Sequence, residues 1–391
     1  MTRCRAEMSA AGRKILIVAG GTGGHIFPAL AFGRWLLDRK EAESVFYLSG
    51  SRPLEVEIYA SQGVRPRRLS LSGSPLGSPS VARSFRRWME LLWSFFQAGH
   101  FLMRERPDIC FLFGGYVSLI PLLWCRLLGV CAVAHEQNAG AGKVTRLAAR
   151  LGVPIASGWN ECRGVRAFTP VGIPVRPLKR ISRKEAASAL EVDVEDGDFV
   201  MGVIGGSLSS ASLSALIEKI SENSADAGGN GIDFIEKNGE NGEKIIFVVL
   251  SDTPAASFGK GVFFVGRRWD MDPFYSLCDA VVCRAGASTL AEIAIYGIPA
   301  LPVPWSLAAD GHQEANARCF AALTGSAVWK EDENAGAGEK ILKETFLEFV
   351  TRARGTRGEA GCKSEPTAAS SALWRFGQRE CGILCEPCER S

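Results

Sequence analysis

The feature that most constrains this chain is an apolar segment that runs directly into a glycine-rich turn and a helical pattern, VAGGTGGHIFPALA at residues 18–31. Glycine permits the sharp turn, and the helix that follows directs unsatisfied backbone N–H groups and a partial positive charge toward an anion. Two turns of the same kind follow, VIGGSLSSASLSAL at 203–216 and VCRAGASTLAEIA at 282–294. Three such turns favour an α/β protein that binds phosphate groups.

The order of apolar and helical segments predicts two domains. Short apolar runs of the kind found in covered parallel strands alternate with helical patterns from Lys14 onward, stop at TPVGIPVRP (169–177), and then begin again. Two successive arrays predict two doubly wound, Rossmann-like α/β domains, at 14–173 and 176–352, with a linker at 169–177. We expect a flexible insertion at 221–243, and a tail at 353–391 with a closing helix at 368–379.

The distribution of charge and the cysteine content indicate the partners and the cellular compartment of the protein. Residues 1–176 hold 23 Lys and Arg against 11 Asp and Glu, a balance of +12, whereas the remainder has a balance of −9. The first half should therefore face an anionic partner: nucleic acid, a membrane surface or a phosphorylated substrate. Twelve cysteines, several in apolar strands, indicate reduced core thiols in the cytosol. The spacing of Cys381, Cys385 and Cys388 lacks a clear fourth zinc ligand.

No segment has the pattern of a signal peptide or a membrane span. Residues 1–14 lack an apolar core. The longest apolar run, 118–134, contains Pro121 and Arg126, so it predicts a buried helix followed by a strand.

Two common nucleotide-binding motifs are excluded by the residues themselves. The first turn has His25-Ile26 where a dinucleotide fingerprint needs its third glycine, and the second strand ends at Leu48-Ser49-Gly50 without a carboxylate. A Walker A lysine is also missing from the turns. The ligand should therefore be neither a nicotinamide dinucleotide nor a nucleotide held by a P-loop.

A set of motifs in fixed order resembles a known family. The chain carries GGTGGHIFPALA, FGGYVSLIP, HEQNAGAGKVTRLAAR, GIPVR, GGS, CRAGASTLAE, GIPALPVPW and DGHQEANA, over roughly residues 14–330. Together they resemble the MurG family of bacterial N-acetylglucosaminyltransferases, within glycosyltransferase family 28. Ile173 stands where the family usually has Asn, and Leu208 lies in a GGSLS segment where the family has GGSQG.

The resemblance implies the fold, the reaction and its setting. The fold would be GT-B, with two Rossmann-like domains facing across a cleft. The enzyme would transfer GlcNAc from UDP-GlcNAc to the MurNAc C4 hydroxyl of lipid I, with inversion, and form lipid II for peptidoglycan synthesis. It would need no metal cofactor, would bind no nucleic acid, and would work peripherally at the cytoplasmic face of the cell membrane, beside proteins of cell-wall synthesis and division.

Site residues follow from the resemblance, position by position. His25, at the start of a helix, would take the proton of the acceptor hydroxyl, since histidine exchanges protons near neutral pH; the alternative is a histidine that caps the helix or binds phosphate. Glu136 is a second candidate base, and Tyr116 belongs to the acceptor side. Donor-binding positions are Thr22, Gly23, Gly24, Asn138, Arg176, Ser207, Arg268, Ala287, Ser288, Thr289, Leu290, Ala291, Glu292 and Gln313.

Three of these donor-site roles have a simple chemical basis. Glu292 would accept hydrogen bonds from ribose hydroxyls, although a carboxylate there also complements a helix dipole. Gln313 would hold a sugar hydroxyl, because an amide both donates and accepts. The pair Asp270 and Asp272 spells the D-x-D of metal-dependent transferases, but N-capping by Asp272 explains it without metal.

A basic and aromatic stretch at 83–106 predicts an amphipathic helix. Arg83, Arg86, Arg87 and Trp88 lie at its start. The helix either packs into the core or rests its basic, aromatic end on anionic lipid. Two other functions remain open: a transferase or epimerase that uses another UDP-sugar, and a non-catalytic protein that binds nucleotide sugars.

Overall fold

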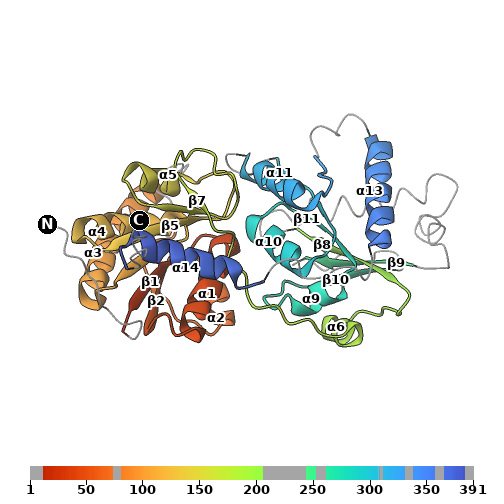
Figure 1. Ribbon diagram of the computed structural model, residues 1–391, viewed down its shortest axis with the longest axis horizontal. Helices are drawn as coiled ribbons and strands as arrows, with labels where there is room; N and C mark the ends of the chain where they lie inside the picture. Colours follow the sequence, from red (N-terminus) through yellow and green to blue (C-terminus); the bar gives the residue numbers. More distant parts are fainter. Residues whose placement is uncertain are drawn as a thin grey trace, which may run out of the picture. The chain divides into compact units, whose positions relative to one another are not determined.

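The computed structural model describes residues 12–73, 81–205, 244–251, 261–306, 308, 311–330, 338–356 and 365–383. The chain divides into two compact units (Figure 1). Unit 1 comprises Met1–Pro177 together with Pro366–Ser391, and unit 2 comprises Leu178–Glu365. The expected insertion at 221–243 and the turn at 206–212 lie outside the described residues.

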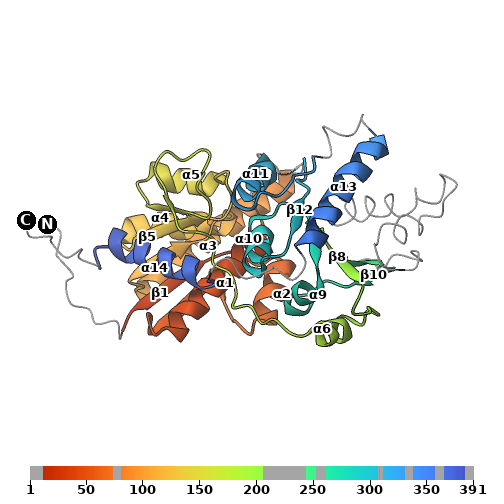
Figure 2. The same cartoon turned by 45° about the vertical axis from the view of Figure 1, so that its right-hand side comes forward.

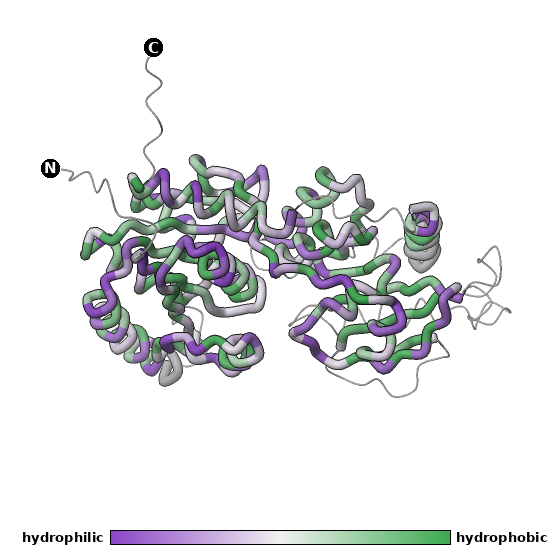
Figure 3. The backbone as a smooth tube through the Cα atoms, turned by 60° about the horizontal axis from the view of Figure 1, so that its bottom comes forward, coloured by the Kyte–Doolittle hydropathy of each residue, from purple (hydrophilic) through white to green (hydrophobic). Residues whose placement is uncertain are grey.

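Unit 1 is built on a parallel sheet that has seven strands in the described part of the chain, in the order β3-β2-β1-β4-β5-β6-β7. The strands are β1 (Lys14–Val18), β2 (Ser44–Ser49), β3 (Arg67–Arg68), β4 (Ile109–Leu112), β5 (Cys131–Glu136), β6 (Ile155–Ser157) and β7 (Thr169–Pro170). The central strands β1, after Lys14, and β4 are continuous apolar runs, because helices cover both faces of the sheet. Hydrophobic stretches, green in Figure 3, alternate with hydrophilic ones along the backbone. The predicted α/β class is confirmed here.

Helices pack on both faces of this sheet. They are α1 (Gly23–Asp38), α2 (Pro53–Ser61), α3 (Val81–Glu105), α4 (Leu119–Leu128) and α5 (Lys143–Arg150), with a short 3₁₀ turn, η1 (Tyr116–Ser118). The apolar run at 118–134 becomes α4 and β5, as expected. α4 ends at Gly129, whose φ of 67° gives the left-handed cap that a side chain would strain.

The C-terminal helix α14 (Ala368–Glu380) belongs to unit 1 and lies along α1 (Figure 2). The indole of Trp374 is buried, and its Nε1 donates to Glu41 at 2.9 Å. A disulfide joins Cys381, just after this helix, to Cys131 at the start of β5. The expectation that the cysteines are reduced is therefore wrong for this pair, and Cys381 is not available as a zinc ligand.

The other described cysteines fit the expectation of core thiols. Cys110, Cys125, Cys162, Cys278 and Cys283 are free and buried, and Cys319 is partly buried. Burial raises the pKa of the Cys283 thiol to about 12, so this thiol stays protonated at neutral pH. Cys385 and Cys388 lie outside the described residues.

Unit 2 has a second parallel sheet, with five strands in the described residues and the order β10-β9-β8-β11-β12. The strands are β8 (Phe199–Ile204), β9 (Ile245–Leu250), β10 (Val262–Val265), β11 (Ala280–Cys283) and β12 (Ala300–Pro302). The helices are α6 (Arg183–Leu190), α9 (Asp272–Leu277), α10 (Ala287–Tyr296), α11 (His312–Thr324) and α13 (Gly338–Gly355).

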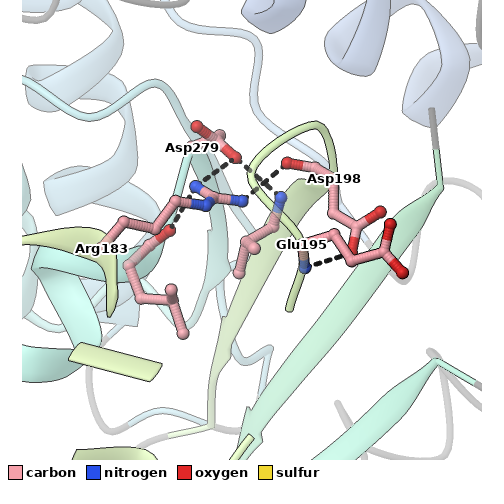
Figure 4. Close-up of polar contacts among 6 residues, drawn as sticks. Arg183, Glu195, Asp198 and Asp279 are labelled. Atoms are coloured by element: carbon pink, nitrogen blue, oxygen red, sulfur yellow. Dashed lines mark hydrogen bonds and ion pairs between the residues drawn. The ribbon is translucent and has the colours of Figure 1, made fainter. Parts of the chain in front are cut away.

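A polar cluster ties the beginning of unit 2 to its sheet (Figure 4). The Asp279 carboxylate accepts from the backbone N–H of Val200 at 2.8 Å and pairs with Arg183 at 3.2 Å. The same guanidinium donates to the carbonyl of Asp198 at 2.6 Å. These bonds hold α6 beside the first residues of β8 and β11.

The segment predicted to be a linker, 169–177, is only partly one. Thr169 and Pro170 form β7, which pairs with β6 at the edge of the unit 1 sheet. Pro170 is tolerated because an edge strand can do without one N–H donor. The boundary between the units falls after Pro177.

Each sheet reverses its strand order beside its first strand. In unit 1 the chain leaves β1 toward β2 and returns to β4 on the other side of β1, and in unit 2 it leaves β8 toward β9 and returns to β11. Ligands of open α/β sheets bind at the carboxyl ends of the strands at such reversals. In unit 1 the turns after β1 and β4 lie at this reversal, and in unit 2 the turn after β11 does.

Candidate active site

The turn between β1 and α1 brings several predicted residues together. Thr22 precedes the helix in extended conformation, and its side chain makes no capping hydrogen bond. Gly23 and Gly24 open the helix, and the carbonyl of Thr22 accepts the N–H of His25 at 3.1 Å. An uncapped helix start of this kind favours an anionic ligand.

A second glycine pair, after β4, lets the chain approach His25 closely. Gly114 and Gly115 have φ of 84° and 74°, which L side chains rarely adopt. A Cβ on Gly114 would lie 3.3 Å from His25 Nδ1, and one on Gly115 would lie 2.5 Å from the carbonyl oxygen of Gly20. The two turns therefore pack directly against each other around the imidazole.

The His25 ring begins a chain of hydrogen bonds that runs into the interior. Its Nδ1 lies 2.6 Å from Oε1 of Gln137, and the Gln137 amide nitrogen lies 2.9 Å from Nδ1 of His135. His135 Nε2 in turn lies 2.9 Å from the carbonyl oxygen of Gly172. Burial lowers the pKa of His135 to about 4, so this ring is neutral at pH 7.

Glu136 is occupied by its own loop. The carboxylate is buried and accepts from the backbone and side-chain nitrogens of Asn138, at 3.1 and 3.2 Å. It also accepts from the N–H of Gly142 at 3.0 Å and from the Thr145 hydroxyl at 2.5 Å. Four hydrogen bonds fill both oxygens, so Glu136 shapes the loop that follows β5.

Tyr116 and Glu55 support the turn after β1 from beneath. The Tyr116 hydroxyl donates to Glu55 Oε1 at 2.7 Å, and the same oxygen accepts the N–H of Gly21 at 2.6 Å. The Arg52 guanidinium lies over the Tyr116 ring at 4.4 Å. Burial raises the pKa of Tyr116 well above its usual range, so its hydroxyl remains a donor.

Arg176, the last predicted residue of unit 1, lies beside α1. Its guanidinium is 4.9 Å from the centre of the Phe27 ring. Phe27 lies two residues after His25 on α1. Unit 1 thus groups Thr22, Gly23, Gly24, His25, Tyr116 and Arg176 with the loop of Glu136 and Asn138.

Unit 2 holds the remaining described donor positions, mostly on α10. The helix begins after Gly286 without a capping side chain, and Ala287, Ser288 and Thr289 form its first turn. Leu290 is fully buried, whereas Ala291 is partly exposed. Glu292 follows, and its Oε2 accepts from the Tyr275 hydroxyl at 3.0 Å.

Gln313 and Arg268 lie on neighbouring segments of unit 2. Gln313 is near the start of α11, and its amide oxygen accepts the N–H of Trp305 at 3.0 Å, so a ligand would meet its NH₂ group. α11 is fixed to the loop before α10 by Asn316, which donates to the carbonyl of Ala285. Arg268 is partly buried after β10, and Ser207 lies outside the described residues.

The two aspartates of the D-x-D pattern do not act as expected. The helix α9 starts at Asp272 itself, and Met271 is its N-cap, so the prediction that Asp272 caps this helix is wrong. Asp270 instead accepts the N–H of Asp272, and Asp272 accepts from the Tyr296 hydroxyl. In the described part of the chain, no three His, Cys, Asp or Glu side chains are grouped so as to hold a metal ion.

The predicted amphipathic helix is α3, and its apolar face is exposed. Phe85 and Trp93 are 68% and 61% exposed, and Trp88, Met89, Leu92 and Phe96 are also exposed. Arg86 pairs with Glu90 at 3.1 Å, Arg87 is partly buried, and the side chain of Arg83 lies outside the described ones. Among the described residues, no helix is both long and apolar enough to cross a membrane.

Sequence reasoning missed three residues that build this site: Gln137, Glu55 and Gly114. Gln137 lies within the HEQN motif, and its position two residues after His135 was the feature of the sequence that could have indicated a contact between them. Glu55 carried no signal, because only the fold brings α2 beneath the first turn.

Solved structures with the same fold cover nearly the whole chain. MurG from Acinetobacter baumannii matches with a TM-score of 0.63 at 22% identity, over 94% of this chain and 99% of that one. The spinosyn rhamnosyltransferase SpnG, in complex with thymidine diphosphate, matches with a TM-score of 0.55 at 14% identity, over 96% and 97%. With two doubly wound parallel sheets, this chain has the GT-B fold.

Sequence comparison places the chain more narrowly. The glycosyltransferase family 28 N-terminal domain matches residues 15–153 and the family 28 C-terminal domain matches 200–354, so the chain belongs to glycosyltransferase family 28. The predicted family resemblance is confirmed.

Two relatives carry the same printed name, UDP-N-acetylglucosamine–N-acetylmuramyl-(pentapeptide) pyrophosphoryl-undecaprenol N-acetylglucosamine transferase. The protein of Thiobacillus denitrificans is 32% identical over 349 residues, which are 86% of this chain and 90% of the relative. That of Desulforudis audaxviator is 30% identical over 370 residues, 92% of this chain and 96% of the relative.

Proposed function

We propose that this family 28 enzyme transfers GlcNAc from UDP-GlcNAc to the MurNAc C4 hydroxyl of lipid I and forms lipid II for the bacterial cell wall. The names of relatives about 30% identical over most of the chain support this donor and this acceptor. The observation that carries the proposal is the imidazole of His25, held by Gln137 at the start of α1, where the unit 1 sheet reverses its strand order.

In the proposed reaction the acceptor oxygen attacks C1 of the donor sugar, and UDP leaves from the opposite face. The new C1–O4 bond forms as the bond to the pyrophosphate oxygen breaks, and Nε2 of His25 takes the hydroxyl proton. His25 suits this role better than its neighbours. His135 is fully buried, and Glu136 would have to give up an internal hydrogen bond.

The leaving pyrophosphate needs positive potential, and unit 2 offers it without a metal. The first turn of α10 presents backbone N–H groups and the hydroxyls of Ser288 and Thr289 where the sheet reverses. Such fixed dipoles stabilise charge that develops on a leaving group. We therefore propose that no metal cofactor is required.

Product analysis tests this function. The purified chain, incubated with radiolabelled UDP-GlcNAc and a lipid I analogue, should yield a disaccharide lipid with a β-1,4 bond. If another UDP-sugar competes better than unlabelled UDP-GlcNAc, the enzyme uses a different donor. Release of labelled ManNAc would indicate an epimerase. Binding of UDP-GlcNAc without any turnover would identify a non-catalytic binding protein.

Replacing Glu292 with alanine should weaken UDP binding by about 1–3 kcal/mol, because ribose hydroxyls and other polar partners lose their acceptor. Isothermal titration calorimetry with UDP measures this. Tyr275→Phe is the matched control, since it removes only the hydroxyl that Glu292 accepts within the protein. Equal UDP affinity in wild type and Glu292→Ala would exclude Glu292 from the donor site.

We further propose that unit 1 contacts the membrane through the exposed face of α3. Aromatic and aliphatic side chains line this face, and residues 1–176 carry a balance of +12. An apolar strip on a basic body suits the surface of an anionic bilayer. A lipid-linked acceptor, as the relatives' names print it, would be reached from that surface.

The protein should sediment with vesicles that contain anionic lipid and should be released in high salt, because salt screens surface charge. Replacing Trp88, Trp93 and Phe96 with serine should abolish most of the vesicle binding that the wild type shows at low salt. Leu323→Ser is the control, since Leu323 is an exposed apolar side chain of unit 2. Unchanged sedimentation of the triple variant would show that another surface is used.

A further inference from the structure

We propose that Gln137 is a positioning residue that fixes the tautomer of His25, so that Nδ1 carries the proton and Nε2 keeps its lone pair. This inference rests on the proposed role of His25 as the base. Only a histidine with an unprotonated Nε2 can take a proton at that atom. The proposal therefore assigns to Gln137 the choice of which ring nitrogen reacts.

The orientation of the Gln137 amide is determined by a backbone carbonyl. Its Nε2 lies 3.0 Å from the carbonyl oxygen of His135, which can only accept. The NH₂ group must therefore point inward, toward His135. The amide oxygen then faces His25, at 2.6 Å from Nδ1.

The hydrogen bonds of His135 lead independently to the same orientation of the Gln137 amide. His135 Nε2 meets the carbonyl oxygen of Gly172, so this nitrogen must carry a proton and donate it. Because His135 is neutral, its Nδ1 has no proton and must accept. An accepting Nδ1 on His135 again requires that the NH₂ group of Gln137 point toward His135.

The consequence for His25 is a single tautomer. An amide oxygen offers no proton, so His25 Nδ1 must donate to it, and the neutral ring is protonated at Nδ1 only. The same hydrogen bond persists after Nε2 takes the acceptor proton, and it strengthens when the ring becomes a cation. Gln137 thus plays the orienting part that a carboxylate plays in a Ser-His-Asp triad, but without a negative charge.

Packing holds this arrangement in place. Gln137 is 1% exposed, and its own carbonyl accepts from the indole of Trp159 at 2.9 Å. Ile173 lies close against Gly158 next to this carbonyl, and a Cβ on Gly114 would lie 3.3 Å from Nδ1 of the His25 ring, which is a tight contact. Gln137 and His135 are thereby shielded from water, whereas the His25 ring is partly exposed.

Nitrogen-15 NMR of the full chain, labelled in histidine, tests the tautomer in the wild type. Correlations from the ring carbon-bound protons to both nitrogens distinguish a protonated Nδ1 from a protonated Nε2. Four histidines are present, and His25→Asn identifies the signals of His25. We expect Nδ1–H for His25 and Nε2–H for His135 at neutral pH; Nε2–H at His25 would overturn the proposal.

Gln137→Met removes the acceptor while nearly keeping the volume of the side chain. The His25 signals should then shift to the Nε2–H form or to a mixture, and kcat should fall on the order of 10-fold, a part of what a positioned base contributes. The KM for UDP-GlcNAc should stay the same. Gln62→Met, which removes an amide at the end of α2, is the matched control and should change neither readout.

The two readouts separate this proposal from the function on which it rests. A wild-type Nδ1–H tautomer that is lost in Gln137→Met, with kcat unchanged, would confirm the positioning and reject His25 as the base. A tautomer that stays Nδ1–H in Gln137→Met would overturn the positioning role whatever the kinetics show.

Discussion

Replacing His25 with alanine should lower kcat by roughly 100-fold or more, because a positioned general base contributes that much to a proton transfer. The affinity for UDP should barely change, since the contacts proposed for the ribose and the pyrophosphate lie on α10 of unit 2. Steady-state kinetics with UDP-GlcNAc and a lipid I analogue measure the first quantity. Calorimetry with UDP measures the second.

A second substitution distinguishes a base from an anion ligand at the same position. His25→Asn keeps a hydrogen-bonding side chain that can reach toward Gln137, but asparagine takes no proton near neutral pH. We expect this variant to be as slow as His25→Ala. If asparagine restores most of the turnover, or if acceptor affinity falls while kcat is kept, His25 binds a phosphate group rather than the proton.

The fold was predictable because its parallel strands are continuous apolar runs. β8 is buried along its whole length and β1 is buried after Lys14, and each strand is followed by a glycine-rich turn, so the pattern is visible in the sequence alone. The same holds for α3, whose alternation of apolar and basic residues predicts an amphipathic helix. The sequence did not show which face of that helix is covered, because this depends on α4 and the sheet.

The bonds between distant segments were not predictable. Cys131 and Cys381 are 250 residues apart, and only the return of α14 to unit 1 brings them together. Glu55 reaches the first turn only because α2 packs beneath it. Asp272 was expected to cap α9, yet Tyr296 from α10 draws its carboxylate away, so a tertiary contact replaced the local one.

Unit 1 should lose about 3 kcal/mol of stability between pH 7 and pH 4 through His135 alone. Burial is the main cause of its lowered pKa; Glu136 and the Gly172 carbonyl oppose it, and His25 adds to it. In the unfolded chain the ring binds a proton below about pH 6.5, whereas in the folded chain it does so only near pH 4. The unfolded state therefore gains protons first as the pH falls, and the folded state becomes less stable over that range.

The difference between wild type and His135→Gln isolates this effect from the carboxylates that titrate in the same range. Hydrogen exchange of peptides from β1 and β5, with the full chain at pH 7, 5 and 4, reports the opening free energy of unit 1. Glutamine does not titrate, so the advantage of the wild type at pH 7 should shrink by about 3 kcal/mol at pH 4. A gap that stays constant with pH would mean that His135 is not held neutral by its burial, and the tautomer assigned to His25 would then lose one of its two supports.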